Sequence, residues 1–296
     1  MAAACAPAAA RLSLDRFEQA MLYHPSREFS VLPRTFRMPS EEVSLAPEPA
    51  ISLHGWFLPA VDGPLADRGL VLLYCHGNGG NVSNRVHKSN VFHKLGLSVL
   101  VFDYRGFGKS TGSPDEAGTY RDGEAAYKFL TGKKGFPPER IILYGESLGN
   151  GVSLELARKR RSAALIVDSA FTSIPDMALE VFPWLPVRPW IRNRYDNLAK
   201  IGGVGRPVLV MHSPEDQVIP FEMGKRLFAA AAEPKAFLEM QGGHDEGYID
   251  SSPRYERAIS DLLKGLPPRS ACGPRPSSPP PGPPSPRSRG RSGPGS

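Results

Sequence analysis

Short apolar runs alternate with helix-like segments along most of the chain, between residues 50 and 265. Several of the apolar runs are uninterrupted, a pattern typical of strands that are buried on both faces of a parallel sheet. The runs that we interpret as strands cover residues 51–60, 69–77, 97–106, 140–147, 164–170, 207–216 and 235–244. The pattern therefore predicts a sheet that is covered on both sides.

Helical patterns fill the gaps, at about residues 83–95, 117–130, 149–161, 220–232 and 253–264. This alternation predicts an α/β fold with a mostly parallel, doubly wound sheet. The first strand, with the segment before it, is expected to form an antiparallel edge. The gap at residues 171–200 is too long for a plain crossover, and its prolines interrupt any continuous helix. We expect this insertion to form a small cap over a functional site.

The chain divides into an N-terminal extension (residues 1–44), one domain (residues 45–265) and a tail (residues 266–296). From residue 265 onward it holds 11 of the 31 prolines, five arginines and no acidic residue. Such a composition cannot bury enough apolar surface to offset the entropy of ordering, which predicts a disordered tail. Those arginines account for most of the formal net charge of +6, so we expect no nucleic-acid partner for the body.

The three cysteines and seven histidines show no spacing typical of a metal site or a disulfide framework. We therefore expect no metal and a cytoplasmic location. The longest apolar run, at residues 70–75, is far too short to span a membrane. Near the N-terminus, a short helix is expected to dock one apolar face on the body, although peripheral membrane contact stays an alternative; that face comprises Leu12, Leu14, Phe17, Met21 and Leu22.

Residues 145–149 read Gly-Glu-Ser-Leu-Gly and lie between a strand-like run and a helix-like segment. In a nucleophile elbow the serine stands on a sharp strand-to-helix turn, and its neighbours two positions away must be small. Gly145 and Gly149 meet that requirement. The start of the helix also favours negative charge that develops nearby. The pattern predicts that Ser147 is a nucleophile.

A serine nucleophile needs a base, and the base needs an orienting acid. In this architecture the chain order is serine, acid, histidine. Asp216 ends the strand at residues 207–216, and His244 follows the last strand, so order and placement predict a triad of Ser147, Asp216 and His244. Glu215 and Asp245 are neighbouring alternatives for the acid, and the turn position favours Asp216.

The oxyanion of an acyl-transfer reaction is held by backbone amides. The residue after the nucleophile, Leu148, is expected to supply one amide. The second is expected from the glycine-rich loop at residues 77–80, where Asn78 is the best-placed residue. A plain turn is the alternative interpretation of that loop.

Five stretches together resemble the serine hydrolases of the α/β-hydrolase superfamily: CHGNGGN, FDYRGFGKSTG, YGESLGNGVSLELA, VDSAFTSI and PVLVMHSPEDQVIP, followed by a final GGH. The likeness covers about residues 45–265 and is nearest to the subfamily of α/β-hydrolase domain-containing protein 13 and its bacterial relatives. It implies the same three catalytic residues, no cofactor, and a cap over the site. The chain departs from the family at His212-Ser213-Pro214, where related turns often read His-Gly.

The combined pattern predicts a serine hydrolase that cleaves a small acyl ester or thioester through an acyl-enzyme. Hydrolysis of an amide or peptide by the same triad is one alternative, and a non-catalytic binding module on this fold is another. The basic tail as a protein-interaction segment is a third. Aromatic residues of the cap region are expected either to line an acyl pocket or to pack on one another: Phe171, Phe182, Trp184 and Trp190.

Overall fold

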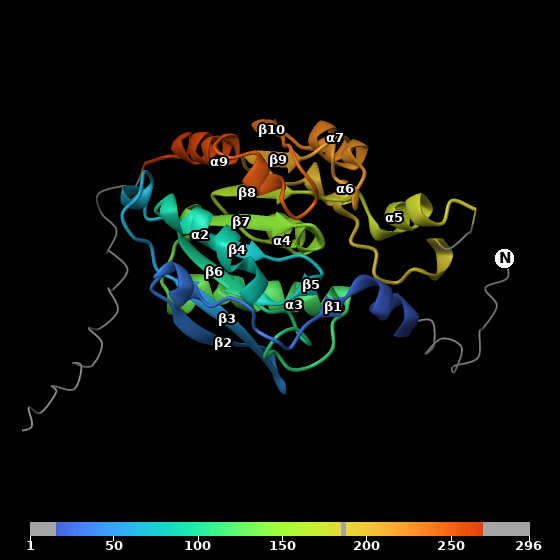
Figure 1. The fold of residues 1–296 in the computed structure, drawn as a ribbon, viewed down its shortest axis with the longest axis horizontal. Coiled ribbons are helices and arrows are strands. Elements are labelled where there is room, and N and C mark those ends of the chain that lie inside the picture. The colour runs from blue at the N-terminus through green and yellow to red at the C-terminus, as the bar shows by residue number, and fades with distance from the viewer. Residues whose placement is uncertain (1–15, 185–187, 269–296) are drawn as a thin grey trace, which may run out of the picture.

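An eight-stranded sheet runs through the middle of the molecule (Figure 1). The computed structural model describes residues 16–184 and 188–268. The six strands from β10 to β6 are mutually parallel, and β3 and β2 add an antiparallel edge. In spatial order the strands are β10 (Lys235–Glu239), β9 (Val208–His212), β8 (Ala164–Asp168), β7 (Ile141–Glu146), β4 (Val71–Cys75), β6 (Ser98–Phe102), β3 (Ile51–Leu58) and β2 (Glu41–Glu48).

Apolar cores cover both faces of the sheet, and most strands contribute to both of them because alternate side chains of a strand point to opposite sides. In β4, Val71, Leu73 and Cys75 belong to one apolar core, and Leu72 and Tyr74 belong to the other. Helices α3 (Glu116–Lys128), α4 (Gly149–Lys159) and α7 (Phe221–Ala230) supply residues to the first core. Helices α2 (Val86–Lys94) and α9 (Arg254–Lys264) supply residues to the second.

The predicted mostly parallel, doubly wound α/β sheet is confirmed, and each of the seven expected strand runs contains a strand. Strand β2 begins at Glu41, four residues before the expected start of the domain. Most of the tail expected to be disordered, residues 269–296, lies outside the described residues. The short helical turns are η1 (Pro33–Phe36), η2 (Ala66–Arg68), η3 (Val82–Arg85), η4 (Phe129–Lys133) and η5 (Pro138–Arg140).

The cap lies between β8 and β9, beyond the carboxyl ends of the parallel strands (Figure 1). It contains α5 (Ile174–Val181), η6 (Arg188–Trp190) and α6 (Asn197–Ile201). Ser173 caps α5, because its side chain accepts a hydrogen bond from the Asp176 amide. The helix ends at Val181, two residues before Pro183, which fits the helix-breaking effect expected of the prolines.

The described part of the N-terminal extension, from residue 16 onward, packs against the domain. A helix over residues 16–22 lies beside the cap in Figure 1, and a short strand β1 (His24–Pro25) follows. Strand β1 pairs in parallel with β5 (Gly79–Gly80), within the glycine-rich loop. Of the face expected to dock on the body, Leu22 packs against the core, whereas Phe17 and Met21 are largely exposed. Leu12 and Leu14 lie outside the described residues.

Candidate active site

Ser147 occupies a strained turn between β7 and α4. Its φ of 51° lies in the left-handed region, which non-glycine residues rarely adopt. The turn needs its two glycines: a Cβ on Gly145 would lie 2.6 Å from the Asn150 Cα, and one on Gly149 only 2.0 Å from the Cys75 carbonyl oxygen. The local sequence therefore explains why the chain can form the sharp strand-to-helix turn that a nucleophile elbow requires.

His244 and Asp216 meet at the carboxyl end of the sheet, although 28 positions separate them in the chain. The Nδ1 of His244 lies 2.7 Å from the Oδ2 of Asp216. Because a carboxylate only accepts, Nδ1 carries the proton and Nε2 is left as an acceptor. The other oxygen, Oδ1, accepts hydrogen bonds of 2.8 Å from the amides of Val218 and Ile219. The side chain of Glu215 is exposed and is not the partner of His244.

The pair is electrostatically coupled. Burial opposes ionisation of Asp216, but hydrogen bonds from His212 and His244 outweigh it and hold the pKa of this carboxyl well below its usual range. Burial likewise opposes a charged His244, yet the hydrogen bond and charge of Asp216 raise the pKa of this imidazole above its ordinary value. His212 is buried, with its Nε2 3.0 Å from the Ile219 carbonyl oxygen. His212 therefore helps to hold the loop that carries Asp216.

Ser147 and His244 line one cavity of about 470 Å³, called here the polar cavity. Among the described residues, no hydrogen bond joins their side chains. Catalytic hydrogen bonds are often long in a ligand-free enzyme and tighten when substrate binds. The structure thus places Ser147 and His244 at the walls of one cavity, and Asp216 contacts His244.

The glycine-rich loop approaches the elbow closely, since a Cβ on Gly77 would lie 3.4 Å from the Ser147 Cβ. The amides of Asn78 and Leu148 donate no hydrogen bond to any described residue. Neither amide therefore has an acceptor among the described residues, as the expected role in an oxyanion hole requires. The strand-like extension fixes this loop from outside: the His24 amide donates to the Asn78 carbonyl, and the Asn78 side chain donates to the Leu22 carbonyl, at 2.8 and 3.0 Å.

Buried side chains hold the same loop from inside. The His76 Nδ1 lies 2.7 Å from the Gly77 carbonyl oxygen, and the Tyr104 hydroxyl donates to the His76 carbonyl. Burial lowers the pKa of His76 to about 4, so this ring is neutral at physiological pH. Asp103 accepts a hydrogen bond of 2.8 Å from the Val82 amide just beyond the loop. The sequence pattern marked this region, but it did not indicate which side chains position the loop.

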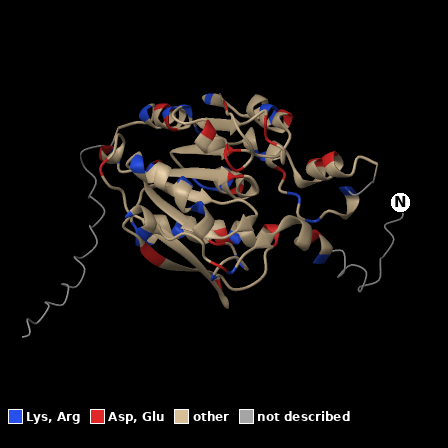
Figure 2. Ribbon diagram, in the orientation of Figure 1, with Lys and Arg blue, Asp and Glu red and all other residues tan. Residues whose placement is uncertain are grey.

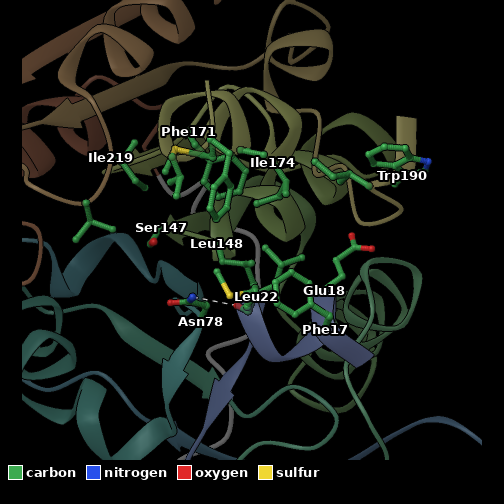
Figure 3. A pocket seen from close by; sticks show the side chains of 17 residues that line it. Phe17, Glu18, Leu22, Asn78, Ser147, Leu148, Phe171, Ile174, Trp190 and Ile219 are labelled. Carbon is green, nitrogen blue, oxygen red and sulfur yellow. Dashed lines mark hydrogen bonds between the residues drawn. The ribbon is translucent and has the colours of Figure 1, made fainter. Parts of the chain in front are cut away.

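A second cavity of about 320 Å³, called here the apolar cavity, extends from Ser147 under the cap (Figure 3). It shares Asn78, Ser147 and Val218 with the polar cavity. The cap, the N-terminal helix and the elbow all supply apolar side chains to it, including Phe17, Met21, Leu22, Leu148, Phe171, Ile174, Met177, Phe182 and Trp190. Three of the four aromatic residues expected at an acyl pocket line this cavity, and Trp184 does not.

A buried charge network lies behind the elbow, and no sequence pattern indicated it. Lys88 Nζ lies 2.9 Å from Glu146 and 3.3 Å from Asp168. Burial disfavours the charged lysine, but Asp168 and Glu146 outweigh this and raise its pKa. The Tyr74 hydroxyl also donates to Glu146, at 2.6 Å. Glu146 directly precedes Ser147, and the Ser147 amide donates a hydrogen bond of 3.0 Å to the backbone carbonyl of Asp168. The network therefore anchors the backbone of the elbow.

Within the described ranges, no group of three or more histidine, cysteine, aspartate or glutamate side chains has an arrangement that could hold a metal ion. In the same part of the chain, every helix is too short or too polar to cross a membrane.

The family model described as alpha/beta hydrolase fold matches residues 71–200. An uncharacterised protein of Mycobacterium tuberculosis is 37% identical over 235 residues, which cover 77% of this chain and 81% of that protein. The chain belongs to the α/β-hydrolase family.

Two further similarities are to proteins that are named as hydrolases. The lysophosphatidylserine lipase ABHD12 of Danio rerio is 32% identical over 223 residues, covering 66% of this chain and 58% of that protein. The solved structure of the Pyrococcus furiosus esterase Pf2001 has a TM-score of 0.65 at 17% identity, and the match covers 83% of this chain and 98% of the esterase. The second likeness shows the common fold alone.

Proposed function

We propose that this protein is a serine hydrolase that cleaves carboxylic esters or thioesters through an acyl-enzyme intermediate. The observation that carries the proposal is the position of Ser147: it lies on a strained turn close to the glycine-rich loop, and it lines the same cavity as His244, which is paired with Asp216. A member of this fold could be a binding module. Such a module has no need of a serine held at a φ of 51° beside an oriented imidazole.

The first half of the reaction transfers the acyl group to the enzyme. Ser147 Oγ attacks the carbonyl carbon, and its proton passes to Nε2 of His244. The charge that develops on the carbonyl oxygen is stabilised by the amides of Leu148 and Asn78. When the tetrahedral intermediate collapses, the bond to the alcohol or thiol breaks, and the leaving group takes the proton from His244. Asp216 keeps the imidazole in the required tautomer and stabilises its charged form.

The second half regenerates the serine. A water molecule gives a proton to His244 and attacks the acyl-enzyme carbonyl carbon, and the same two amides stabilise the new oxyanion. Collapse of this intermediate breaks the bond to Ser147, which regains its proton from His244 as the carboxylic acid leaves. Water is the co-substrate, and in each half of the reaction His244 takes up one proton and releases it again.

The two cavities suggest how the substrate is oriented. The apolar cavity suits the acyl chain, since its walls are formed almost wholly by apolar side chains. The polar cavity, which His244 lines, suits the alcohol or thiol that must receive the proton. The similarity to the Danio rerio protein, which is named a lipase, favours an ester over a thioester as the substrate.

A panel of p-nitrophenyl esters from acetyl to dodecanoyl tests the proposal. We expect hydrolysis by the wild type, with kcat/KM rising as the acyl chain fills the apolar cavity, and a loss of about 10⁴-fold or more in Ser147→Ala and His244→Ala. Hydrolysis that persists in both folded variants would refute the assigned roles. Absence of hydrolysis across the panel, with cleavage of matching amides instead, would move the protein to the amidase class.

A further inference from the structure

Large apolar side chains that are strongly exposed gather at the mouth of the apolar cavity. Eight such side chains occur among the described residues. Five of them line this single cavity: Phe17, Met21, Val181, Trp190 and Val218. A sixth, Trp184, follows the cavity-lining Phe182 by two residues and is 76% exposed. Scattered exposed apolar residues need no explanation, but their concentration around one opening does.

These six residues, called here the apolar rim, come from three segments that are distant in the chain. The N-terminal helix supplies two, the cap supplies three, and the loop after β9 supplies one. Figure 3 shows Phe17 and Trp190 on opposite sides of the cavity, with Ser147 at its inner end. Phe17 is 62% and Trp190 60% exposed, so much of their apolar surface remains uncovered. The rim therefore encloses an opening that leads to the candidate nucleophile.

The charges beside the rim nearly cancel. The N-terminal helix and the segment at residues 174–196 contain four basic residues (Arg16, Arg188, Arg192, Arg194) and four acidic residues (Glu18, Asp176, Glu180, Asp196), and the loop after β9 adds the exposed Glu215. Figure 2 shows blue and red residues intermixed over this part of the molecule. A surface with almost no net charge gains little from an anionic membrane or a charged protein face. Its attraction to a partner must come mainly from apolar contact.

We propose that the apolar rim docks on a zwitterionic lipid surface. Tryptophan rings are favoured at such an interface because they combine a large apolar body with a polar N–H. A folded protein partner or a second copy seated on the rim would close the opening of the cavity. A lipid surface instead leaves the cavity connected to a phase in which acyl chains are dissolved.

The purpose of this docking rests on the proposed hydrolase activity: a docked enzyme would take an acyl chain into the apolar cavity directly from the lipid layer. The docking itself does not require catalysis. It can therefore be measured on Ser147→Ala, which keeps the rim and removes the proposed nucleophile. A failure of docking and a failure of the proposed function are thus separate results.

The protein carries its own optical probe for the test. It has three tryptophans: Trp56 is 6% exposed within the core, and the other two belong to the rim. Titration of Ser147→Ala with phosphatidylcholine vesicles should shift the tryptophan emission to shorter wavelength, and lipids brominated on their chains should quench it. Both effects are expected to persist in about 0.5 M NaCl, because screening weakens only charge attraction.

Two double variants decide which surface binds. Phe17→Ser with Val181→Ser removes rim residues and keeps all three tryptophans, and we expect its partition coefficient to fall at least about tenfold. Val61→Ser with Ile249→Ser is the matched control: these side chains are 37% and 57% exposed and do not line the apolar cavity. The control is expected to bind within about twofold of the parent.

Three results would overturn the proposal. The first is an unchanged emission spectrum with phosphatidylcholine vesicles. The second is binding to anionic vesicles alone that salt abolishes, which would assign the interaction to the arginine-rich tail. The third is a concentration-dependent emission shift without lipid, accompanied by dimerisation in analytical ultracentrifugation, which would assign the rim to a second copy of the chain.

Discussion

Glu18 joins the N-terminal helix to the cap, and its removal should change which acyl chains the protein accepts. Its carboxylate accepts hydrogen bonds from the Arg192 amide at 3.1 Å, the Asn193 amide at 2.7 Å and the Asn193 side chain at 3.1 Å. The Asn193 Oδ1 in turn accepts from the Glu116 amide at 2.7 Å. Within residues 16–22, Glu18 is the one acidic residue, so Glu18→Ala would leave these donors without a carboxylate from the described part of the helix.

The size of the effect follows from these contacts. A hydrogen bond to a charged group contributes about 1.5–3 kcal/mol when buried, and less when it is half exposed as here. We therefore expect the docked helix to lose about 2 kcal/mol of stability for the whole cluster, which is about a 30-fold shift toward the undocked arrangement. Phe17, Met21 and Leu22 then leave the wall of the apolar cavity for part of the time.

The assay compares acetyl and dodecanoyl p-nitrophenyl esters. In Glu18→Ala, kcat/KM should fall roughly tenfold for the dodecanoyl ester and less than about twofold for the acetyl ester, which does not reach that wall. Glu28→Ala is the matched control, because this glutamate is exposed and its side chain makes no hydrogen bond to a described residue. An equal loss for both esters would refute the assignment of the helix to the acyl site.

Three other variants test the elbow, its buried support and the acid. Gly149→Ala places a Cβ 2.0 Å from a backbone oxygen and should lower the free energy of unfolding by about 2 kcal/mol or more in urea titration, whereas a neutral effect would contradict the tightness of this turn. Lys88→Met leaves two buried carboxylates without this cation, and the same measurement should show a free energy of unfolding lower by about 3–5 kcal/mol. In the control Lys94→Met, at an exposed lysine, the free energy of unfolding should change by less than about 0.5 kcal/mol. The base must be neutral, so kcat/KM should fall as pH drops through the raised pKa of His244. Asp216→Asn removes the cause of that raised pKa, so the acid limb should move to lower pH while the rate falls by about 10⁴-fold; an unmoved limb would argue against the pairing.

The sheet could be predicted because its signals are local and repeated. Uninterrupted apolar runs such as residues 70–75 are typical of strands buried on both faces, and the structure has β4 there. The elbow could be predicted for a similar reason, because the sharp turn at Ser147 requires small residues two positions away, and Gly145 and Gly149 stand there. The ends of strands β9 and β10 then located the acid and the histidine.

Other parts of the site depend on pairings that no local pattern encodes. Lys88 reads as an ordinary helical lysine until the fold places it against Glu146 and Asp168, which are 58 and 80 positions away. The parallel pairing of His24 with Gly79 likewise involves two residues on each strand, too few to produce a periodic signal. Trp184 was expected either to line an acyl pocket or to pack on other aromatic residues of the cap, but it lies beyond the end of α5 and is exposed.

The most direct test of the account is covalent labelling with a fluorophosphonate probe, followed by intact-mass measurement. An activated serine at the elbow predicts addition of one probe to the wild type and to the exposed-serine control Ser113→Ala, and none to Ser147→Ala. A folded wild type that remains unlabelled, or labelling that persists in Ser147→Ala, would contradict the assignment of Ser147 as the nucleophile.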